Sequence, residues 1–441
     1  MQHPYIPNAE PRVKAEMLAV TGAEAVADFY ADIPEKLRLS RRLDLPEPLP
    51  AEADLVRHVG GLLERNTSTA EALSFLGAGC YRHYVPAICD EINSRSEFLT
   101  AYAGEPYEDH GRFQAMWEYQ SMMGELLEMD VVNVPTYDGF QAAATALRMA
   151  GRVTGRGRVA IATPIDPDKL SKLADYLAGA LEIGGPIAGE DLAAVFVDYP
   201  TYLGALDPET QSYVEKAHAA GALAVVACDP VGLGVLAPPA ALGADIVCGD
   251  LQSLGMHPQY GGGHAGFIAT ADDERLVAEH PSRLFGLVPT QVPGEYGFGD
   301  VAWDRTSLGV REDGKEWVGT ASALWGITAG VYLALMGPEG MRGLGEGLLA
   351  RTAYAKRVLA EISGVDIPQS HLTHLKEFAV RFAGRTVAEV NAGLRNRGIF
   401  GGKDLSADFP EFGASALYCV TEQHTTDDID RLADALKEIL P

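Results

Sequence analysis

Lysine is scarce in this chain of 441 residues, and the stretch between Lys216 and Lys315 contains none of its ten lysines. Cysteine is scarce as well: the five residues are odd in number and include no CxxC pair, which predicts reduced and mostly buried thiols. No apolar run is long enough to span a membrane, and the start lacks the basic and apolar regions of a secretory signal. We therefore expect a cytoplasmic protein that does not enter a membrane.

Basic residues are few relative to acidic ones. The chain has 35 Lys and Arg against 61 Asp and Glu, a net charge of -26. Such a surface repels nucleic acid and anionic lipid, which argues against either as a partner. We also find no metal-ligand spacing, no Ser/His/Asp arrangement and no Walker-type loop, so we expect no metal site.

The patterning divides the sequence into three expected parts. Residues 1–65 predict an arm of short helices interrupted by prolines. Residues 66–335 alternate apolar strands with amphipathic helices, which predicts an α/β domain with a mostly parallel sheet. Residues 336–441 predict a small α+β domain that opens with a long helix over 344–362.

Two apolar strands form the most informative part of the chain. Ala222–Cys228 runs into Asp229, and Gly243–Cys248 runs into a loop that contains Gln252 and Ser253. This arrangement resembles the fold-type-I pyridoxal-phosphate (PLP) enzymes of the aspartate-aminotransferase type. Such enzymes hold the pyridine nitrogen with a carboxylate after the first strand and form a Schiff base with a lysine after the second. The absence of that lysine suggests one half of a two-chain enzyme.

Other residues have both a functional and a structural interpretation. Tyr137–Gly139 precedes a helix of small residues, which suits a phosphate cradle or a tight strand-to-helix turn. Asp229 could pair with a pyridine nitrogen or cap a strand-end turn. Gly261–Gly266 could let the backbone approach a ligand or form a hairpin. His83, His257 and His264 could be acid/base groups, aromatic lids or loop residues without a role.

A series of motifs in order along the chain resembles the glycine-cleavage P-protein family, glycine dehydrogenase (decarboxylating), in the form that is split into two subunits. The chain is similar to subunit 1, the subunit without the PLP lysine. The matching segments are Tyr5–Asn8, Ala31–Glu35, Ser74–Gly79, His83–Tyr84, Met129–Asn133, Tyr137–Gly139, Asp229–Pro230, Gly243–Val247, Gln252–Gly255, Gly261–Gly262, Leu335–Gly340, Arg397–Ile399, Gly401–Gly402 and Val420–Glu422.

The resemblance implies a subunit of a PLP-dependent glycine decarboxylase, with the cofactor bound covalently by a lysine-bearing subunit 2 in an α2β2 assembly. The enzyme would transfer an aminomethyl group to lipoyl H-protein and release CO2. Residues expected to contribute to catalysis at the mouth of the shared site are His83, Tyr84, Tyr102, Glu108 and Thr320. The chain's own pseudo-site would comprise Tyr137, Asp138, Gly139, Asp229 and Ser253.

Two segments depart from the family's usual sequence, at 103–111 and 314–322. Changed loops on a kept scaffold are typical of a paralogue with another substrate or acceptor. Three alternatives to the glycine enzyme therefore stay open. They are a two-chain enzyme for a different small amino acid or acceptor, a non-catalytic structural or regulatory subunit, and a self-sufficient enzyme that uses Lys315 or another lysine.

Overall fold

The computed structural model of the chain describes residues 5, 8–99, 112–315 and 322–441. The chain divides into two compact units, 1–67 and 68–441. The first unit contains α1 (Pro11–Thr21), the 3-10 helices Val26–Tyr30 and Glu35–Leu37, and α2 (Glu52–Leu63). None of the residues in these helices is buried.

The second unit is built on a seven-stranded sheet in the order β2-β8-β7-β6-β5-β3-β4. The five strands from β4 to β7 run parallel, whereas β8 is antiparallel to both β7 and β2. This arrangement confirms the predicted α/β class with a mostly parallel sheet. The strands are β2 (Val131–Val132), β3 (Arg158–Ile161), β4 (Glu182–Ile183), β5 (Leu192–Tyr199), β6 (Leu223–Cys228), β7 (Ile246–Asp250) and β8 (Gly266–Thr270).

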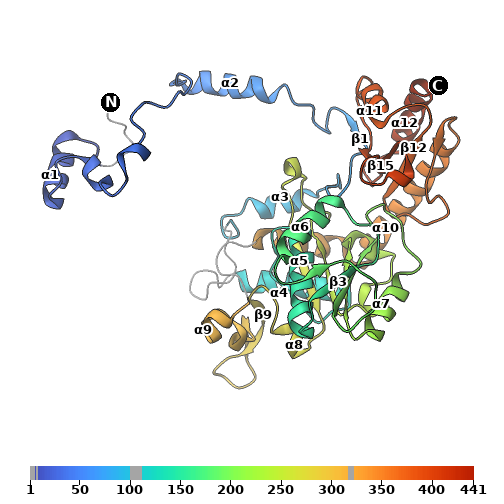
Figure 1. The fold of residues 1–441 in the computed structure, drawn as a ribbon, viewed down its shortest axis with the longest axis horizontal. Coiled ribbons are helices and arrows are strands. Elements are labelled where there is room, and N and C mark those ends of the chain that lie inside the picture. The colour runs from blue at the N-terminus through green and yellow to red at the C-terminus, as the bar shows by residue number, and fades with distance from the viewer. Residues whose placement is uncertain (1–4, 6–7, 100–111, 316–321) are drawn as a thin grey trace. The chain divides into compact units, whose positions relative to one another are not determined.

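Both faces of this sheet are covered by helices, as Figure 1 shows. Successive strand residues point to opposite faces, so Phe196 packs in the core under α5 and α6, while Val195 and Val197 pack in the core under α4 and α7. Burial on both faces explains why the strands read as unbroken apolar runs. The helices are α4 (Phe113–Leu127), α5 (Gly139–Thr154), α6 (Pro167–Leu177) and α7 (Thr210–Ala219).

The C-terminal residues form an antiparallel sheet in the order β11-β12-β15-β14, with its own hydrophobic core. Figure 1 shows α11 and α12 beside this sheet. The elements are β11 (Val365–Asp366), β12 (Glu377–Phe382), α11 (Val387–Arg395), β14 (Lys403–Asp404), β15 (Ser415–Cys419) and α12 (Thr426–Ile439). A separate short parallel pair joins β1 (Leu73–Ser74) to β13 (Ile399–Phe400).

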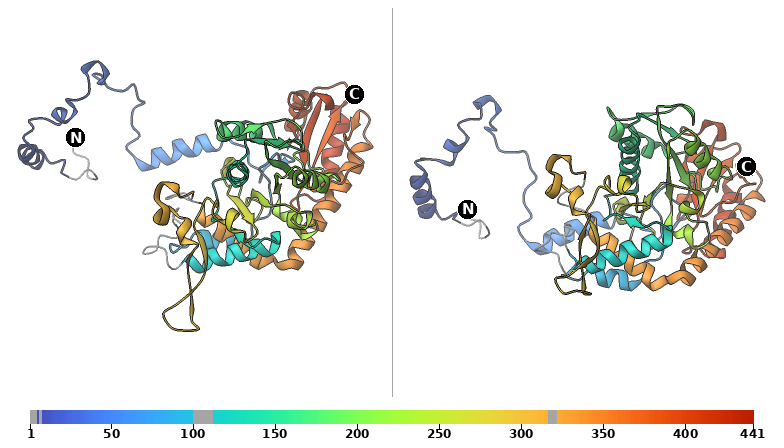
Figure 2. Two further views of the ribbon diagram at one scale, coloured as in Figure 1. Left: turned by 60° about the horizontal axis from the view of Figure 1, so that its bottom comes forward. Right: turned by 90° about the horizontal axis from the view of Figure 1, so that it is seen from below.

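A long kinked helical element, α10 (Ala323–Ala360), connects the large sheet's layers to the C-terminal sheet. Figure 2 shows it in orange, entering the red C-terminal region. The predicted helix over 344–362 was therefore wrong at its start. Gly337 has a φ of 58° and Pro338 follows it within the helix. The backbone of Gly337 is non-helical, so α10 consists of two helical segments that meet at a kink, and Pro338 stands at the start of the second segment.

The remaining described elements lie in connections. A hairpin of β9 (Leu284–Pro289) and β10 (Tyr296–Val301) was not predicted, because its glycines and prolines mask the alternation of a strand. Short helices are α3 (Ala87–Asn93), α8 (Glu274–Val277) and α9 (Ser307–Val310). Within the described part of the chain, every helix is too short or too polar to cross a membrane.

Candidate functional site

A cavity of about 360 Å³ lies where the carboxyl ends of β5, β6 and β7 meet the N-terminus of α5. Parallel α/β sheets place ligand sites at this edge. Four predicted pseudo-site residues, Asp138, Gly139, Asp229 and Ser253, line it together, whereas Tyr137 does not. The C-terminal sheet closes the cavity with two charged residues at the start of β12, Lys376 and Glu377, which the sequence analysis did not identify.

Asp229 ends β6 and is paired with a cation from this same chain. Its carboxylate forms a salt bridge with Lys376, and its other oxygen accepts a hydrogen bond from the Ser253 hydroxyl at 3.2 Å. Burial alone would raise the pKa of Asp229, but the adjacent Lys376 ammonium outweighs burial and holds the pKa below its ordinary value. The carboxylate that would hold a pyridine nitrogen is therefore already neutralised by an internal lysine.

Lys376 is almost completely buried at the edge of the cavity. Its side chain is 4% exposed, and its ammonium lies 3.4 Å from the centre of the Tyr81 ring and 3.1 Å from Nε2 of His83. An ammonium placed over an aromatic face is stabilised by the ring quadrupole. The Lys376 amine is thus fixed by an anion, a ring and an imidazole.

Gln252 and Ser253 occupy the position after β7 where a Schiff-base lysine was expected, and Gln252 has a structural role. Its side-chain oxygen accepts a hydrogen bond from the Tyr81 amide at 2.9 Å, and its Nε2 donates to the carbonyls of Tyr81 at 2.9 Å and Met256 at 3.0 Å. The amide group therefore clamps the segment that contains Tyr81 to the end of the sheet. A lysine at this position could not accept the first of these bonds.

Carboxylates of this chain occupy the start of α5, where a phosphate would bind in a complete cofactor site. Asp138 caps the helix by accepting from the Gln141 amide at 2.7 Å, and Asp250 accepts from the Gly139 amide at 2.8 Å. A Cβ on Gly139 would lie 2.9 Å from the Cβ of Asp250, so glycine is required for this close approach. A phosphate would meet two carboxylates in place of free amide groups.

The other lysines of the cavity are paired too. Lys169 contacts Asp198 at 2.6 Å, and Lys172 contacts Asp138 at 3.0 Å. Lys315, the alternative that the sequence left open for an internal Schiff base, is exposed and does not line the cavity. The residues present therefore do not fit PLP in the chain's own site, because its nitrogen partner, its phosphate cradle and its lysine position are all taken by other groups.

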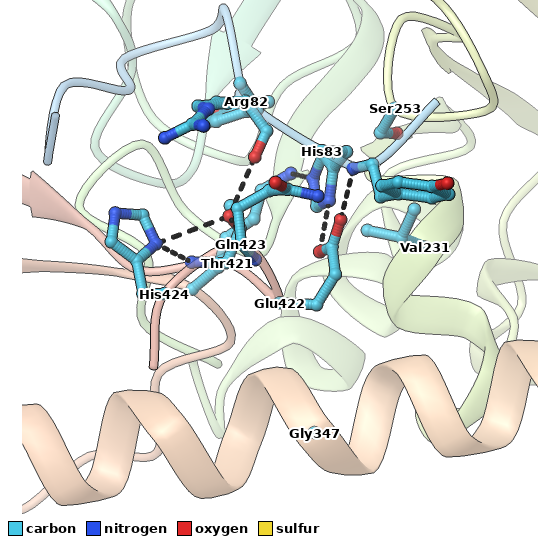
Figure 3. A network of polar contacts seen from close by, with 12 residues as sticks. Arg82, His83, Val231, Ser253, Gly347, Thr421, Glu422, Gln423 and His424 are labelled. Atoms are coloured by element: carbon cyan, nitrogen blue, oxygen red, sulfur yellow. Dashed lines mark hydrogen bonds and ion pairs between the residues drawn. The ribbon is translucent and has the colours of Figure 1, made fainter. Parts of the chain in front are cut away.

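A second polar network anchors residues 82–84 to the end of β15 (Figure 3). His83 is buried, its Nδ1 lies 2.8 Å from Oε2 of Glu422, and the other oxygen of Glu422 accepts from the Tyr84 amide. Because an ammonium can only donate, Nε2 of His83 accepts from Lys376 and Nδ1 donates to Glu422. Burial would raise the pKa of Glu422, yet the hydrogen bonds from His83 and Tyr84 lower it to about 2.

The side chain of Tyr84 lies outside this network, although its backbone amide belongs to it. Its backbone is fixed by Glu422, while its side chain is 61% exposed. The adjacent Thr421 hydroxyl donates to the Arg82 carbonyl at 2.7 Å, which adds a further tie to this segment (Figure 3). His83 is therefore a buried member of the scaffold, whereas Tyr84 has an anchored backbone and an exposed ring.

Glu377 is the third side chain, after Gln252 and Glu422, that holds residues 78–84 by hydrogen bonds. It accepts from the Ala78 amide at 2.6 Å and from the Tyr81 hydroxyl at 2.8 Å. Burial raises the pKa of Glu377 to about 7. The remaining predicted residues, Tyr102, Glu108 and Thr320, lie outside the described residues.

The fold and the position of this cavity define the class, the fold-type-I PLP enzymes. At the level of fold alone, the chain is similar to a solved NifS-like protein, with a TM-score of 0.61 and 12% identity over 83% of this chain and 99% of that chain. It is much more similar to a solved glycine decarboxylase (P-protein) of the glycine cleavage system in inhibitor-bound form. That match has a TM-score of 0.85 and 35% identity, and it covers all of both chains.

The family model described as glycine cleavage system P-protein matches residues 3–436, and the chain belongs to this family. Among its relatives are proteins named probable glycine dehydrogenase (decarboxylating) subunit 1. The relative from Geobacillus kaustophilus is 37% identical over 99% of both chains. The relative from Thermococcus onnurineus is 36% identical over 99% of both chains. The family resemblance expected from the sequence motifs is confirmed.

Proposed function

We propose that this chain is the lysine-less subunit of a two-chain glycine decarboxylase, which works with a lysine-bearing subunit 2 in an α2β2 assembly. Subunit 2 holds PLP covalently, glycine loses its carboxyl group as CO2, and lipoyl H-protein accepts the aminomethyl group. We place the assembly in the cytoplasm. The proposal agrees with the names of the relatives and with the solved P-protein.

One observation supports the proposal that subunit 2, and not this chain, binds PLP. The chain keeps the fold of a PLP enzyme, but Lys376 pairs with Asp229 and Asp250 accepts from the first amide of α5. A chain whose own cofactor position is closed by internal ion pairs and hydrogen bonds contributes to catalysis through another subunit's site. PLP, when bound by that subunit, supplies the electron sink for decarboxylation.

The residues of this chain then act by positioning. Gln252, Glu377 and Glu422 fix the backbone of residues 78–84 from separate elements, so the backbone position from which the exposed Tyr84 ring extends is fixed. We propose that Tyr84 contacts the substrate at the shared site and that His83 holds it there. We further assign Tyr102, Glu108 and Thr320 to the mouth of the same site.

Reconstitution with subunit 2 and H-protein tests this function. Release of labelled CO2 from carboxyl-labelled glycine should require both subunits and lipoylated H-protein. Replacing Tyr84 by alanine removes the proposed substrate contact and should reduce turnover by up to about 100-fold. A substrate that shifts by about 1 Å from its reactive position loses about that factor. Tyr296→Ala, at a 66% exposed tyrosine of β10, serves as the matched control. Turnover by subunit 2 alone would contradict the proposal.

A second candidate rests on the segments 103–111 and 314–322, which differ from the family's usual sequence. In this alternative the two-chain architecture serves a different small amino acid or an acceptor other than lipoyl. The same reconstituted complex, supplied with a panel of small amino acids and without H-protein, distinguishes the two. Turnover that is independent of H-protein favours the paralogue. Full turnover after truncation of segment 103–111 favours a structural or regulatory subunit.

A further inference from the structure

A second groove, with a volume of about 690 Å³, lies between the end of α4, strand β2, the segment after β8 and the β9–β10 hairpin. None of its described lining residues lines the candidate site, so the two are separate. Pockets of roughly 300–1,000 Å³ are the usual size for small organic ligands. The groove therefore has room for a ligand of that kind.

The described rim of this groove carries only negative charge. Its charged lining residues are Glu125, Glu128, Asp130 and Asp272, and all of them are exposed. Asp130 accepts a hydrogen bond from the Asp272 amide at 3.0 Å, which holds these two residues together. No lysine, arginine or histidine is among the described lining residues, and none of these carboxylates forms an ion pair with a described residue.

Two of the carboxylates lie at the C-terminal end of α4. Glu125 is in its last turn and Glu128 is its C-cap residue, while this last turn contains no basic residue. The carbonyl end of a helix has a partial negative charge, which stabilises cations and destabilises carboxylates. Within the described part of the chain, the negative charge at this end of the groove is therefore not compensated.

A buried amide provides an independent indication of a ligand. Gln120 lines the groove and is 8% exposed, and its Nε2 donates to the Val132 carbonyl. Because a carbonyl only accepts, this bond fixes which end of the amide is the oxygen. That oxygen, Oε1, is buried and has no hydrogen-bond donor among the described residues. An unpaired buried acceptor is costly, so a ligand that donates a hydrogen bond would stabilise this position.

Buried apolar side chains form the floor of the groove. An aliphatic cation can place its methylene groups on such a floor and keep its charged ends at a polar rim. A bare metal ion would gain nothing from the floor, and no group of His, Cys, Asp and Glu among the described residues is arranged to hold one. The residues of the floor are Met129, Val132, Leu284 and Phe285.

We propose that this groove is a binding site for a linear aliphatic polyammonium ion, the chemistry of a polyamine. The methylene groups contact the apolar floor, and the ammonium groups pair with Glu125, Glu128 and Asp272 at the rim. One ammonium hydrogen is donated to Oε1 of Gln120. An ammonium group has donors and no acceptor, so it suits the carboxylates and the amide oxygen alike. The site requires neither subunit 2 nor the candidate site of this chain.

Calorimetric titration of the purified full chain with spermidine tests the proposal. The buffer contains about 0.15 M salt, which screens exposed charges beyond about 8 Å. We expect one saturable site per chain and a melting temperature that rises with spermidine, because a ligand of the folded state stabilises it. Mg²⁺ is the comparison, since it has charge but no methylene groups, and it should bind at least ten-fold more weakly. Equal affinity for Mg²⁺, or several equivalent weak sites, would overturn the proposal.

Variants of the groove separate a built site from a generally acidic surface. Glu125→Gln/Glu128→Gln should weaken spermidine binding roughly ten-fold, because each exposed charge pair contributes up to about five-fold. Glu182→Gln/Glu190→Gln is the matched control, since it changes the net charge equally at exposed residues outside the groove.

Gln120→Leu should also weaken spermidine binding, because it removes the buried acceptor. An unchanged affinity in a folded Glu125→Gln/Glu128→Gln chain would overturn the proposal, even if Gln120→Leu fails to fold. An equal loss of affinity in the Glu182→Gln/Glu190→Gln control would overturn it as well.

Discussion

Replacing Lys376 by methionine tests whether an internal ion pair closes the chain's own cofactor position. The Lys376 side chain is 4% exposed and that of its partner Asp229 is 16% exposed. Methionine keeps most of the volume but leaves the carboxylate without its cation and His83 without its donor. Removing one partner of a buried ion pair costs about 3–5 kcal/mol.

Thermal unfolding of the purified chain measures this effect. In a unit as large as residues 68–441, about 3–5 kcal/mol corresponds to a fall of roughly 4–6 °C in the melting temperature. The double variant Lys376→Met/Asp229→Asn should recover at least half of the loss, because no charge is then buried alone. Lys437→Met is the control, since its pair with Asp434 is exposed. A Lys376→Met chain that melts within about 1 °C of the wild type would refute the reasoning.

Three further predictions concern pH and packing. Burial raises the pKa of Glu377 to about 7, so between about pH 4.5 and about pH 7 the folded chain keeps a proton that the unfolded chain releases. The free energy of unfolding should therefore fall as pH rises through this range. Glu377→Gln should flatten this pH dependence in denaturant titrations. Hydrogen bonds lower the pKa of Glu422 to about 2 although burial opposes this. The contribution of Glu422 to the free energy of unfolding should therefore be complete above about pH 4.5 and disappear towards about pH 2. Glu422→Gln should remove this acid transition. Gly139→Ala should lower the free energy of unfolding by about 1–3 kcal/mol, since the new Cβ would lie 2.9 Å from the Cβ of Asp250. The control Gly157→Ala should be nearly neutral, because a Cβ at that position would have no neighbouring atom within 4 Å.

The central strands could be predicted because their signal is local. Ala222–Cys228 and Gly243–Cys248 are apolar runs between helical patterns, and they fold as β6 and β7 with both faces buried. The start of α10 could not be placed, since Gly337 and Pro338 mark a real break between two helical segments, and the first segment before them was not predicted. The β9–β10 hairpin was missed for a similar reason, since Pro289 and the glycines of β10 weaken the strand pattern.

The candidate site shows the same division. Asp229 and the missing lysine after β7 were evident from their places at strand ends. Lys376 was not evident, because it is far from Asp229 in the sequence and only the docking of the C-terminal sheet brings the two together. The partner of His264 was equally hidden, since this residue reads as one loop histidine among several until the fold places it beside Asp250.

The central claim is that PLP belongs to the partner and not to this chain. The most direct measurement is to incubate the purified chain with PLP, reduce with borohydride, and determine the intact mass and peptide map, first alone and then with subunit 2. The account predicts no stoichiometric adduct on this chain and an adduct on subunit 2 only. A stoichiometric adduct on one lysine of this chain, Lys376 included, would contradict it.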